Sequence, residues 1–425
     1  MTATQHPTPD RVKKTTLPSG LRVLTEEIES VRSLSVGIWV KTGSRHEKEE
    51  QAGVTHFLEH MLFKGTETRS AYDIALSMES VGGYLNAFTS TEFTCYFARC
   101  LDSKLDTALD VLSDMVLHPI FPEEEVEKEK KVVLEEMKMY KDNPEDYIFE
   151  EFNSLVFKDH PLGRPIIGHE NTVNSFKRSD LYNYMDERYQ PDNLIVAVAG
   201  NTSHDEVVKR VEKLFERQKA GKSTEIETPV VSYKPDRKDL TRPIEQTHYI
   251  LGRRSLPSDH EDRYKLLLAN TILGGGMSSR LHQHIREQYG YCYAIQSFNQ
   301  GFSDSGLFGI YVGTDKEYVE HVRELVMKEL ETLRNEQVSA KELTEAKAQL
   351  KGKMLLAQEN MSNRMMRLAK SEIYYNRYIP LDELIENIDG VQADDIIDFS
   401  EGFFVEDQVS ETRLLPEEAE TEASA

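Results

Sequence analysis

Two histidines and a glutamate stand close together in the segment His56-Phe57-Leu58-Glu59-His60. On a helix, residues four apart lie on one face, one turn from each other, so both imidazoles can reach a single ion. Glu59 lies on the same face and can accept a proton from a water molecule at that ion. The spacing therefore predicts a metal site suited to hydrolysis, with both ligands and the base within one helical turn.

A catalytic zinc site usually has three protein ligands and one open position, so two histidines leave one ligand to be found. The candidate is Glu136, on a long helix expected over Glu123–Tyr140. Glu129 lies two turns earlier on the same face and can orient a histidine. Glu135 points about 100° away around that helix. The alternative is a polar cluster that satisfies itself without metal, but the apolar residues around the histidines indicate a buried helix, where such groups need a partner.

Two similar series of elements are expected to position these residues. In the first half, strands are expected over Leu34–Lys41, Asn86–Ala98 and Leu194–Gly200, and helices over the histidine segment, Lys104–Leu117 and Glu123–Tyr140. In the second half, strands are expected over Gln246–Gly252 and Gly306–Thr314, and helices over Asp262–Leu273 and Lys316–Asn335. The order of elements agrees, which indicates a divergent internal repeat.

The repeat predicts that the metal site occurs once. Leu266, Ala269 and Asn270 stand opposite the two histidines and the glutamate of the first half, and Lys353 stands opposite Glu136. None of these four side chains supplies an equivalent ligand or base. Both halves can therefore share a scaffold while only the first does metal chemistry.

A chain of 425 residues is too long for one ordinary core and suits two domains. We expect a metal-binding domain over residues 1–220, a linker over 221–240 and a second domain without metal ligands over 241–415. The linker is rich in Lys, Thr, Pro and Glu and has no sustained apolar period. Residues 416–425 are acidic and are expected to be disordered.

Composition narrows the classes of function. The net charge of −23 argues against nucleic-acid binding, and a solvated acidic surface, a salt-adapted host or a preference for basic peptides would each account for it. No apolar run approaches the ~18 residues of a membrane span. Cys95, Cys100 and Cys292 have no framework spacing, and the N-terminus has no apolar segment of a secretory signal. A cytoplasmic location is expected.

Four segments together carry a resemblance to a known family. Gly53–Thr66 looks like the active-site segment of the pitrilysin/insulinase family, and is most similar to the branch of mitochondrial processing peptidase and its bacterial relatives. Gly82–Thr89 resembles the strand beside the metal, Glu129–Glu136 the helix of the third ligand, and Ser279–Tyr293 the motif of the second domain. The similarity runs over about residues 15–410.

The resemblance implies a zinc endopeptidase acting on unfolded or extended peptides. His56, His60 and Glu136 would bind one zinc ion per chain, and Glu59 would be the general base. Glu129 would not bind the metal itself but would orient one of the histidine ligands.

Other family positions imply contacts with substrate. Arg286 and Tyr293 would correspond to a pair that reaches the substrate from the second domain. The alternative for Arg286 is a surface salt bridge, and the alternative for Tyr293 is a position in the core. Because a second tyrosine, Tyr291, lies two residues earlier, the sequence leaves open which of the two hydroxyls contacts the substrate. Asn86 and Ala87 would lie on a strand edge to which a peptide can add, unless this is an ordinary sheet strand. Phe57 would line a side-chain pocket or belong to the core.

The fold implied is α+β, with two similar domains, each a mostly antiparallel sheet packed with helices, forming half of a clamshell chamber. A dimer is implied, either with itself or with a related subunit whose motif is degenerate. Two other classes remain: a non-catalytic structural or substrate-holding subunit of the same fold, and a different metal hydrolase or oxidoreductase. The complete motif disfavours the first, and the absence of a second ligand set disfavours the other.

Overall fold

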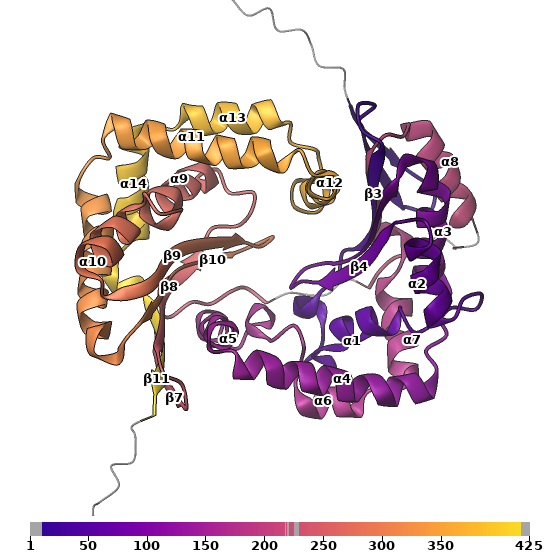
Figure 1. The fold of residues 1–425 in the computed structure, drawn as a ribbon, viewed down its shortest axis with the longest axis horizontal. Coiled ribbons are helices and arrows are strands. Elements are labelled where there is room, and N and C mark those ends of the chain that lie inside the picture. The colour runs from indigo at the N-terminus through magenta and orange to yellow at the C-terminus, as the bar shows by residue number, and fades with distance from the viewer. Residues whose placement is uncertain (1–10, 217, 219–220, 225–228, 418–425) are drawn as a thin grey trace, which may run out of the picture. The chain divides into compact units, whose positions relative to one another are not determined.

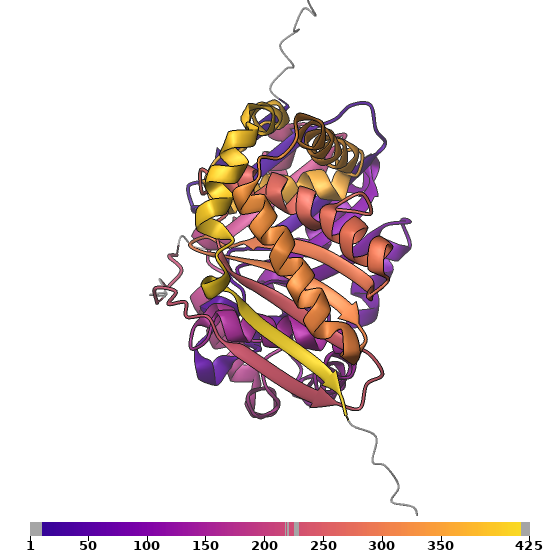
Figure 2. The same cartoon turned by 90° about the vertical axis from the view of Figure 1, so that its left-hand side faces the viewer.

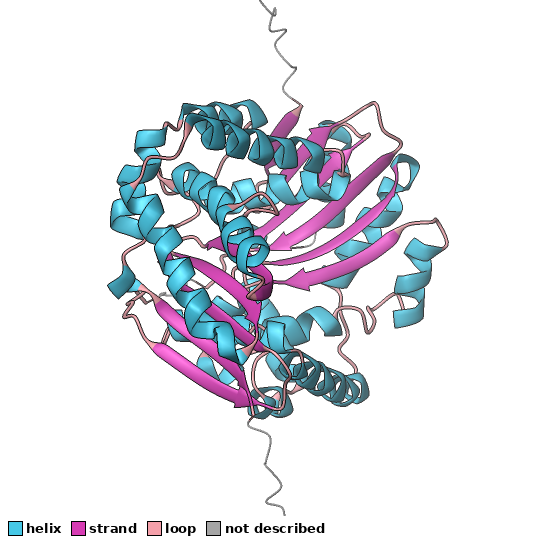
Figure 3. Ribbon diagram, turned by 60° about the vertical axis from the view of Figure 1, so that its left-hand side comes forward, coloured by secondary structure: helices cyan, strands magenta, loops and turns pink. Residues whose placement is uncertain are grey.

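The computed structural model describes residues 11–216, 218, 221–224 and 229–417. Within them the chain forms two compact units, and each unit is a sheet with helices packed on it (Figure 1, Figure 3). The predicted fold class of two similar sheet-and-helix domains is confirmed. Among the described residues no helix combines the length and the apolar character needed to cross a membrane.

Unit 1 contains a six-stranded sheet in the order β1-β2-β6-β3-β5-β4. β2 and β6 run parallel, and the other neighbouring pairs run antiparallel. β6 is Leu-Ile-Val-Ala-Val-Ala-Gly and is buried along its whole length, as expected for a central strand. The strands are β1 (Val12–Thr16), β2 (Arg22–Glu27), β3 (Ser33–Val40), β4 (Tyr84–Thr89), β5 (Thr94–Leu101) and β6 (Leu194–Gly200).

Helices cover both faces of this sheet. Figure 1 shows α3 and α8 on one face and α12 on the other. The helices are α1 (Val54–Met61), α2 (Ala71–Glu79), α3 (Leu105–Leu117), α4 (Glu123–Asp142), α6 (Glu170–Ser175), α7 (Arg178–Arg188), α8 (His204–Leu214) and α12 (Met361–Tyr375).

Unit 2 repeats the topology with a five-stranded sheet in the order β7-β11-β8-β10-β9. β7 and β11 run parallel and the remaining pairs antiparallel, so the pattern equals that of β2-β6-β3-β5-β4 in unit 1. The internal repeat read from the sequence is therefore present in the strand order. The strands are β7 (Arg237–Arg242), β8 (Thr247–Ser255), β9 (Cys292–Gly301), β10 (Gly306–Thr314) and β11 (Ser410–Pro416).

The helices of unit 2 enclose its main core. α10 and α14 lie in front of the sheet in Figure 2, and α9 packs against β9 and α14. Their apolar faces join those of the strands in one buried cluster. The helices are α5 (Pro144–Val156), α9 (Arg263–Gly274), α10 (Val319–Asn335), α11 (Ala340–Ala357), α13 (Leu381–Gly390) and α14 (Ala393–Phe403).

The two halves of the chain exchange one helix each. α5 lies in the first half of the sequence but packs on β8 and β11 of unit 2, whereas α12 lies in the second half and packs on β3 and β6 of unit 1. These are equivalent strands of the two sheets. Unit 1 therefore comprises Met1–Glu136, Arg164–Thr228 and Leu356–Tyr378, and unit 2 comprises Met137–Gly163, Pro229–Leu355 and Ile379–Ala425.

This exchange makes the division of the chain differ from the contiguous domains expected over 1–220 and 241–415. The change of unit at Thr228/Pro229 falls inside the expected linker, but β7 begins within that linker and pairs with β11. Of the expected tail, residues 418–425 lie outside the described residues, as do 225–228 of the linker.

α12 is fixed to its sheet by close contacts. The Trp39 indole of β3 donates to the Met365 sulfur at 3.2 Å, and both side chains are fully buried. Gly37 allows this approach, because a Cβ at that position would lie 2.6 Å from the same sulfur. Buried Glu372 pairs with Lys14 at 2.6 Å and with Arg22 at 3.3 Å.

One expected strand is wrong. Asn86–Ala98 forms two strands, β4 and β5, joined by a turn in which the Ser90 side chain accepts from the Phe93 amide. Thr is enriched in strands, and the hydroxyls of Ser and Thr also support turns, so the residue types here do not mark the break. The hairpin makes β4 the edge of the sheet.

Candidate metal centre

The N-terminus of α1 is fixed before the first histidine. Gly53 precedes the helix with a φ of 90°, and a Cβ there would lie 2.8 Å from the Cα of Gly168 in the opposing chain segment. The buried Glu47 carboxylate accepts from the amides of Gly53 at 2.7 Å and Thr55 at 2.8 Å. A carboxylate at this end satisfies unpaired amides and opposes the positive end of the helix dipole. The position of α1 is thus set by contacts outside the helix.

α1 is amphipathic, and its two faces have different tasks. Leu58 and Met61 enter the core, while His56, Glu59 and His60 form the partly exposed face. Phe57 is fully buried, with its ring 5.4 Å from that of Phe176. The suggestion that Phe57 lines a substrate pocket is therefore wrong, because its side chain has no exposed surface.

The structure brings the three expected ligands together. Glu136 Oε2 lies 3.8 Å from His56 Nε2 and 3.6 Å from His60 Nε2. One ligand atom from each residue lies within 4.8 Å of the others, and this is the one such group found in the described part of the chain. These separations exceed hydrogen bonds but suit donors that share an ion at ~2.0–2.2 Å from each.

The polar atoms of this group also fit a metal. Glu136 Oε2 is buried without a hydrogen-bond partner among the described residues, although it faces two imidazole nitrogens. An unpaired buried carboxylate oxygen is costly, and a cation between it and the nitrogens would satisfy it. Glu135, the neighbouring residue on α4, is exposed and is not part of the group.

Glu129 and Lys64 stand behind His60. Glu129 Oε1 accepts from His60 Nδ1 at 2.8 Å, and its other oxygen pairs with Lys64 Nζ at 2.5 Å. The proton on Nδ1 leaves the Nε2 lone pair of His60 directed to the ligand group. Glu129 thus lies where the sequence analysis expects it, whereas the contact of Lys64, which follows the end of α1 by three residues, was not expected.

The charge states of the ligands follow from burial and from these partners. Burial lowers the pKa of His56 to about 3, with a further lowering by His60. Burial also acts to lower the pKa of His60, but the hydrogen bond to Glu129 and the charge of Glu136 outweigh it and raise that pKa. Burial raises the pKa of Glu136. The shifts of His56 and Glu136 show that burial disfavours their charged forms, whereas the shift of His60 shows that its carboxylate neighbours favour a positive charge there.

Glu59 is held by the edge strand. Thr89 Oγ1, at the end of β4, donates to Glu59 Oε2 at 2.5 Å. Burial raises the pKa of Glu59, and the Thr89 hydrogen bond acts against that shift. A carboxylate with a raised pKa is a stronger proton acceptor, which is the property a general base needs.

The next two expected residues on β4 lie at the sheet edge. β4 pairs with β5 on one side and has no strand neighbour on the other among the described residues. The exposed Asn86 donates to the Tyr84 hydroxyl at 2.6 Å, and its side-chain oxygen accepts from the Ala87 amide at 2.9 Å. This edge offers backbone groups to which an extended chain can add.

Arg286 and Tyr293 belong to unit 2, where they contact each other. Arg286 lies in a π-helical turn, His282–Glu287, and its Nε donates to the Tyr293 carbonyl at 3.0 Å. Its Nη1 donates to His282 Nε2 at 2.9 Å and to Glu287 Oε1 at 3.0 Å. The surface salt bridge given as the alternative for Arg286 is present, with Glu287 as its partner, together with the contacts to Tyr293 and His282 that the sequence did not suggest.

Tyr293 is placed by a bulge and by a glycine. β10 pairs Gly313 with Ala294 and Thr314 with Cys292, so Tyr293 is the extra residue of a β-bulge. Its ring lies over Gly313, where a Cβ would be 2.3 Å from the ring carbon Cζ. Such bulges often re-aim a side chain near a functional site.

Tyr293 and Tyr291 differ in the surroundings of their side chains. Tyr293 is 46% exposed, so the alternative of a core side chain does not hold. Tyr291 instead stacks between Tyr289 and Tyr318, with ring centroids 5.3 Å and 4.8 Å apart. Of the two tyrosines, Tyr293 is the one that adjoins Arg286.

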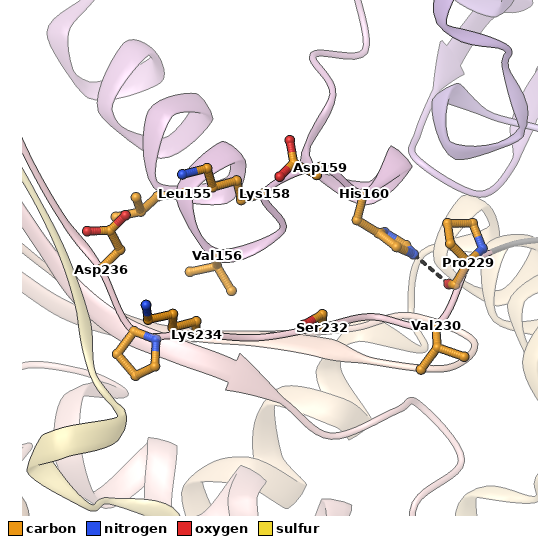
Figure 4. Close-up of a pocket in the computed structure, with 11 residues that line it drawn as sticks. Leu155, Val156, Lys158, Asp159, His160, Pro229, Val230, Ser232, Lys234 and Asp236 are labelled. Carbon is orange, nitrogen blue, oxygen red and sulfur yellow. Dashed lines mark hydrogen bonds between the residues drawn. The ribbon is translucent and has the colours of Figure 1, made fainter.

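A separate pocket of about 370 Å³ lies in unit 2 and contains none of the expected site residues (Figure 4). It is formed between the end of α5 and the segment 229–236. His160, which lines it, donates from Nε2 to the Pro229 carbonyl at 2.9 Å and accepts at Nδ1 from the Leu162 amide. Both ring nitrogens are occupied in holding the loop, so this histidine is structural.

The fold and the metal group together define a protein with an inverted H-x-x-E-H motif on one of two similar units. The chain belongs to peptidase family M16: residues 22–170 match the family described as Insulinase (Peptidase family M16), and residues 175–350 match the Peptidase M16 inactive domain. The resemblance to the pitrilysin/insulinase family noted in the sequence is confirmed. The match to the inactive domain covers most of the second half of the chain, which has no counterparts of the metal-ligating residues.

Curated relatives cover nearly the whole chain. An uncharacterized zinc protease of Bacillus subtilis, YmxG, is 41% identical over 93% of this chain and 96% of its own length. An uncharacterized zinc protease of Rickettsia felis is 41% identical over 91% and 94%, respectively.

Solved structures show the same fold. A protease from Helicobacter pylori has a TM-score of 0.90 at 24% identity and covers 95% of this chain and 99% of its own. A peptidase M16 inactive domain from Pseudomonas fluorescens has a TM-score of 0.89 at 21% identity, covering 96% and 99%.

Proposed function

We propose that the protein is a zinc-dependent endopeptidase that hydrolyses peptide bonds in unfolded or extended peptides. The observation that carries this proposal is the convergence of His56, His60 and Glu136 beside Glu59, with an unpaired buried oxygen on Glu136. The names of the relatives as zinc proteases support zinc as the metal. One ion per chain is proposed, because the ligand set occurs once in the described residues.

The chain's own residues supply the proton chemistry. When bound, zinc would polarise the scissile carbonyl and acidify a water molecule. Glu59 would take the proton of the attacking water at its carboxylate and later deliver it to the leaving amine. Thr89 would keep that carboxylate in place, and Glu129 would orient His60. Each role requires only contacts within unit 1.

Peptide binding is proposed at the β4 edge and at the pair in unit 2. Backbone groups around Ala87 would pair with an extended peptide, which gives grip with little dependence on sequence. Asn86, exposed at the same edge, would hydrogen-bond the peptide. Arg286 and Tyr293 would donate to the carbonyl oxygen where negative charge develops.

Assembly and location are also proposals. A homodimer, or a heterodimer with a related subunit, is proposed from the family branch that the sequence resembles. Work in the cytoplasm is supported by Cys95, Cys100 and Cys292, which are buried and unpaired. No role in nucleic-acid or membrane binding is proposed.

A paired activity measurement tests the proposal. Purified wild-type chain and Glu59→Gln are each incubated with a quenched fluorescent peptide, and zinc is measured by elemental analysis. We expect wild type to cleave and Glu59→Gln to keep its zinc but lose at least a hundredfold in kcat. A wild type that binds zinc but does not cleave, alone or with a related subunit, would favour the non-catalytic alternative.

A further inference from the structure

The guanidinium of Arg286 is held at two of its three nitrogens. Nε donates to the Tyr293 carbonyl, and Nη1 donates to both His282 Nε2 and Glu287 Oε1. Nη2 has no hydrogen-bond partner among the described residues, and the side chain is 39% exposed. Since the guanidinium is planar and rigid, fixing Nε and Nη1 also fixes the direction of the donors on Nη2.

The contact with His282 determines the state of that histidine. A guanidinium donates only, so His282 Nε2 must accept, and the imidazole is neutral with its hydrogen on Nδ1. His282 Nδ1 is buried without a hydrogen-bond partner among the described residues, and Glu287 Oε1 lies 3.8 Å from it, beyond hydrogen-bond distance. An unpaired buried donor is uncommon and calls for an explanation. Presenting the Nε2 lone pair to Arg286 supplies one.

A neutral acceptor differs from a carboxylate in its effect on charge. An aspartate in this place would orient Arg286 but would also cancel much of its positive charge. The imidazole orients the guanidinium and leaves that charge available to a ligand. Glu287 contacts the same Nη1 but is 52% exposed, so solvent screens its charge.

We infer that His282 is a positioning residue for the reaction: its neutral Nδ1–H form fixes Arg286 so that Nη2 faces the oxygen on which charge develops. This inference rests on the proposed function. The rare π-helical turn agrees with it, because such turns occur frequently at functional sites. Fully buried Ile285 anchors the turn in the core of unit 2, so the support under the pair is rigid.

A matched control lies in the same turn. His284 is two residues from His282 and is 52% exposed, and it pairs with Glu329 at 2.8 Å rather than with Arg286. Replacing His284 tests the effect of losing a histidine from this turn without touching the proposed anchor.

The test compares kcat and KM on a quenched fluorescent peptide for His282→Leu, His282→Gln and His284→Leu. His282→Leu removes the acceptor and is expected to lower kcat about tenfold, with KM and zinc content little changed, which is the scale of one charge-assisted hydrogen bond. His282→Gln offers an amide oxygen and should recover most of the loss, and His284→Leu should match wild type. Equal losses for both leucine variants would overturn the inference.

A double-variant cycle isolates the route through Arg286. If His282 acts only through Arg286, adding His282→Leu to Arg286→Leu should cause no further loss. Losses that multiply would show that His282 acts elsewhere and would contradict the inference.

The tautomer of His282 gives a readout that does not depend on activity. In protein with ¹⁵N-labelled histidine at pH 8, the resonances missing from His282→Leu identify this residue. The Nδ1–H tautomer is expected, and the Nε2–H tautomer would overturn the inference even in an inactive chain. A wild type that fails to cleave, yet shows the Nδ1–H tautomer, would contradict the proposed function while supporting the anchor.

Discussion

The hydroxyl of Thr89 donates a hydrogen bond of 2.5 Å to Oε2 of Glu59. This contact joins the last residue of edge strand β4 to the metal-site helix α1. A peptide added to β4 would therefore approach the carboxylate proposed as general base, and the strand that binds the peptide would also orient that base.

Replacing Thr89 with valine should alter the pH dependence of cleavage. The lost hydrogen bond favours the charged form of Glu59, so the pKa of this carboxyl should rise further above its usual value. The base must be ionised, so the acid limb of kcat/KM against pH should move upward by about one unit. Thr89→Ser keeps the hydroxyl and should restore the wild-type profile. An unchanged limb in Thr89→Val would count against this role.

Removing the carboxylate behind His60 should weaken metal binding. Glu129→Gln loses a charged acceptor for His60 Nδ1, and such changes behind a ligand reduce affinity about 10- to 100-fold. Zinc affinity can be measured by competition with a chelator. Glu135→Gln on the same helix is the control, because Glu135 is exposed and outside the ligand group. Similar losses in both variants would show a general effect of charge.

The sequence was sufficient to predict those parts of the site whose residues lie on the same helix. His56, Glu59 and His60 share one helical turn, and Glu129 and Glu136 share a face of α4, so helix periodicity was sufficient. The joining of the two helices was inferred from a family resemblance. Phe57 failed as a pocket residue because its direction into the core depends on Phe176, far along the chain.

Features that depend on distant contacts were missed. The exchange of α5 and α12 leaves no local signal, because an amphipathic helix looks the same whichever sheet it covers. The support of Arg286 by His282 spans only four residues, but this spacing alone does not show which of its neighbours an arginine contacts. Glu47, which accepts from two amides of α1, precedes the helix by several residues and has no capping-box spacing.

Glu47 should make stability depend on pH. Burial raises the pKa of Glu47 to about 7, despite hydrogen bonds from Thr55 and Gly53. The usual pKa of this carboxyl is 4.5, so the folded state favours the protonated form of Glu47. Its contribution to the free energy of unfolding is therefore complete below about pH 4.5 and is lost as pH rises toward 7. The free energy of unfolding falls by about 3 kcal/mol over this pH range because of Glu47. In urea unfolding of metal-free protein, the decline between pH 5 and 7 should be smaller in Glu47→Gln, and an equal decline would refute this assignment.

Gly313→Ala should displace Tyr293. The added Cβ would lie 2.3 Å from the tyrosine ring, so the ring must move. We expect kcat to fall about tenfold while zinc content stays unchanged. Gly352 on α11 is the control, since a Cβ there meets nothing within 4 Å. Full activity in Gly313→Ala would mean that the position of this ring does not matter.

The docking of α12 can be followed by fluorescence, because Trp39 is the single tryptophan of the chain. Met365→Ala removes a fully buried side chain that contacts its indole and should cost about 2–5 kcal/mol of unfolding free energy. The emission of the folded variant should change as well. Unchanged emission would contradict the placement of α12 on unit 1.

Metal stoichiometry of ligand variants tests whether His56, His60 and Glu136 form a zinc site. Wild type, Glu136→Gln and Glu135→Gln are saturated with zinc, dialysed and analysed for metal per chain. We expect about one zinc per chain in wild type and in Glu135→Gln, and a large loss in Glu136→Gln. No zinc in wild type, or full retention in Glu136→Gln with loss in Glu135→Gln, would contradict the assigned metal centre.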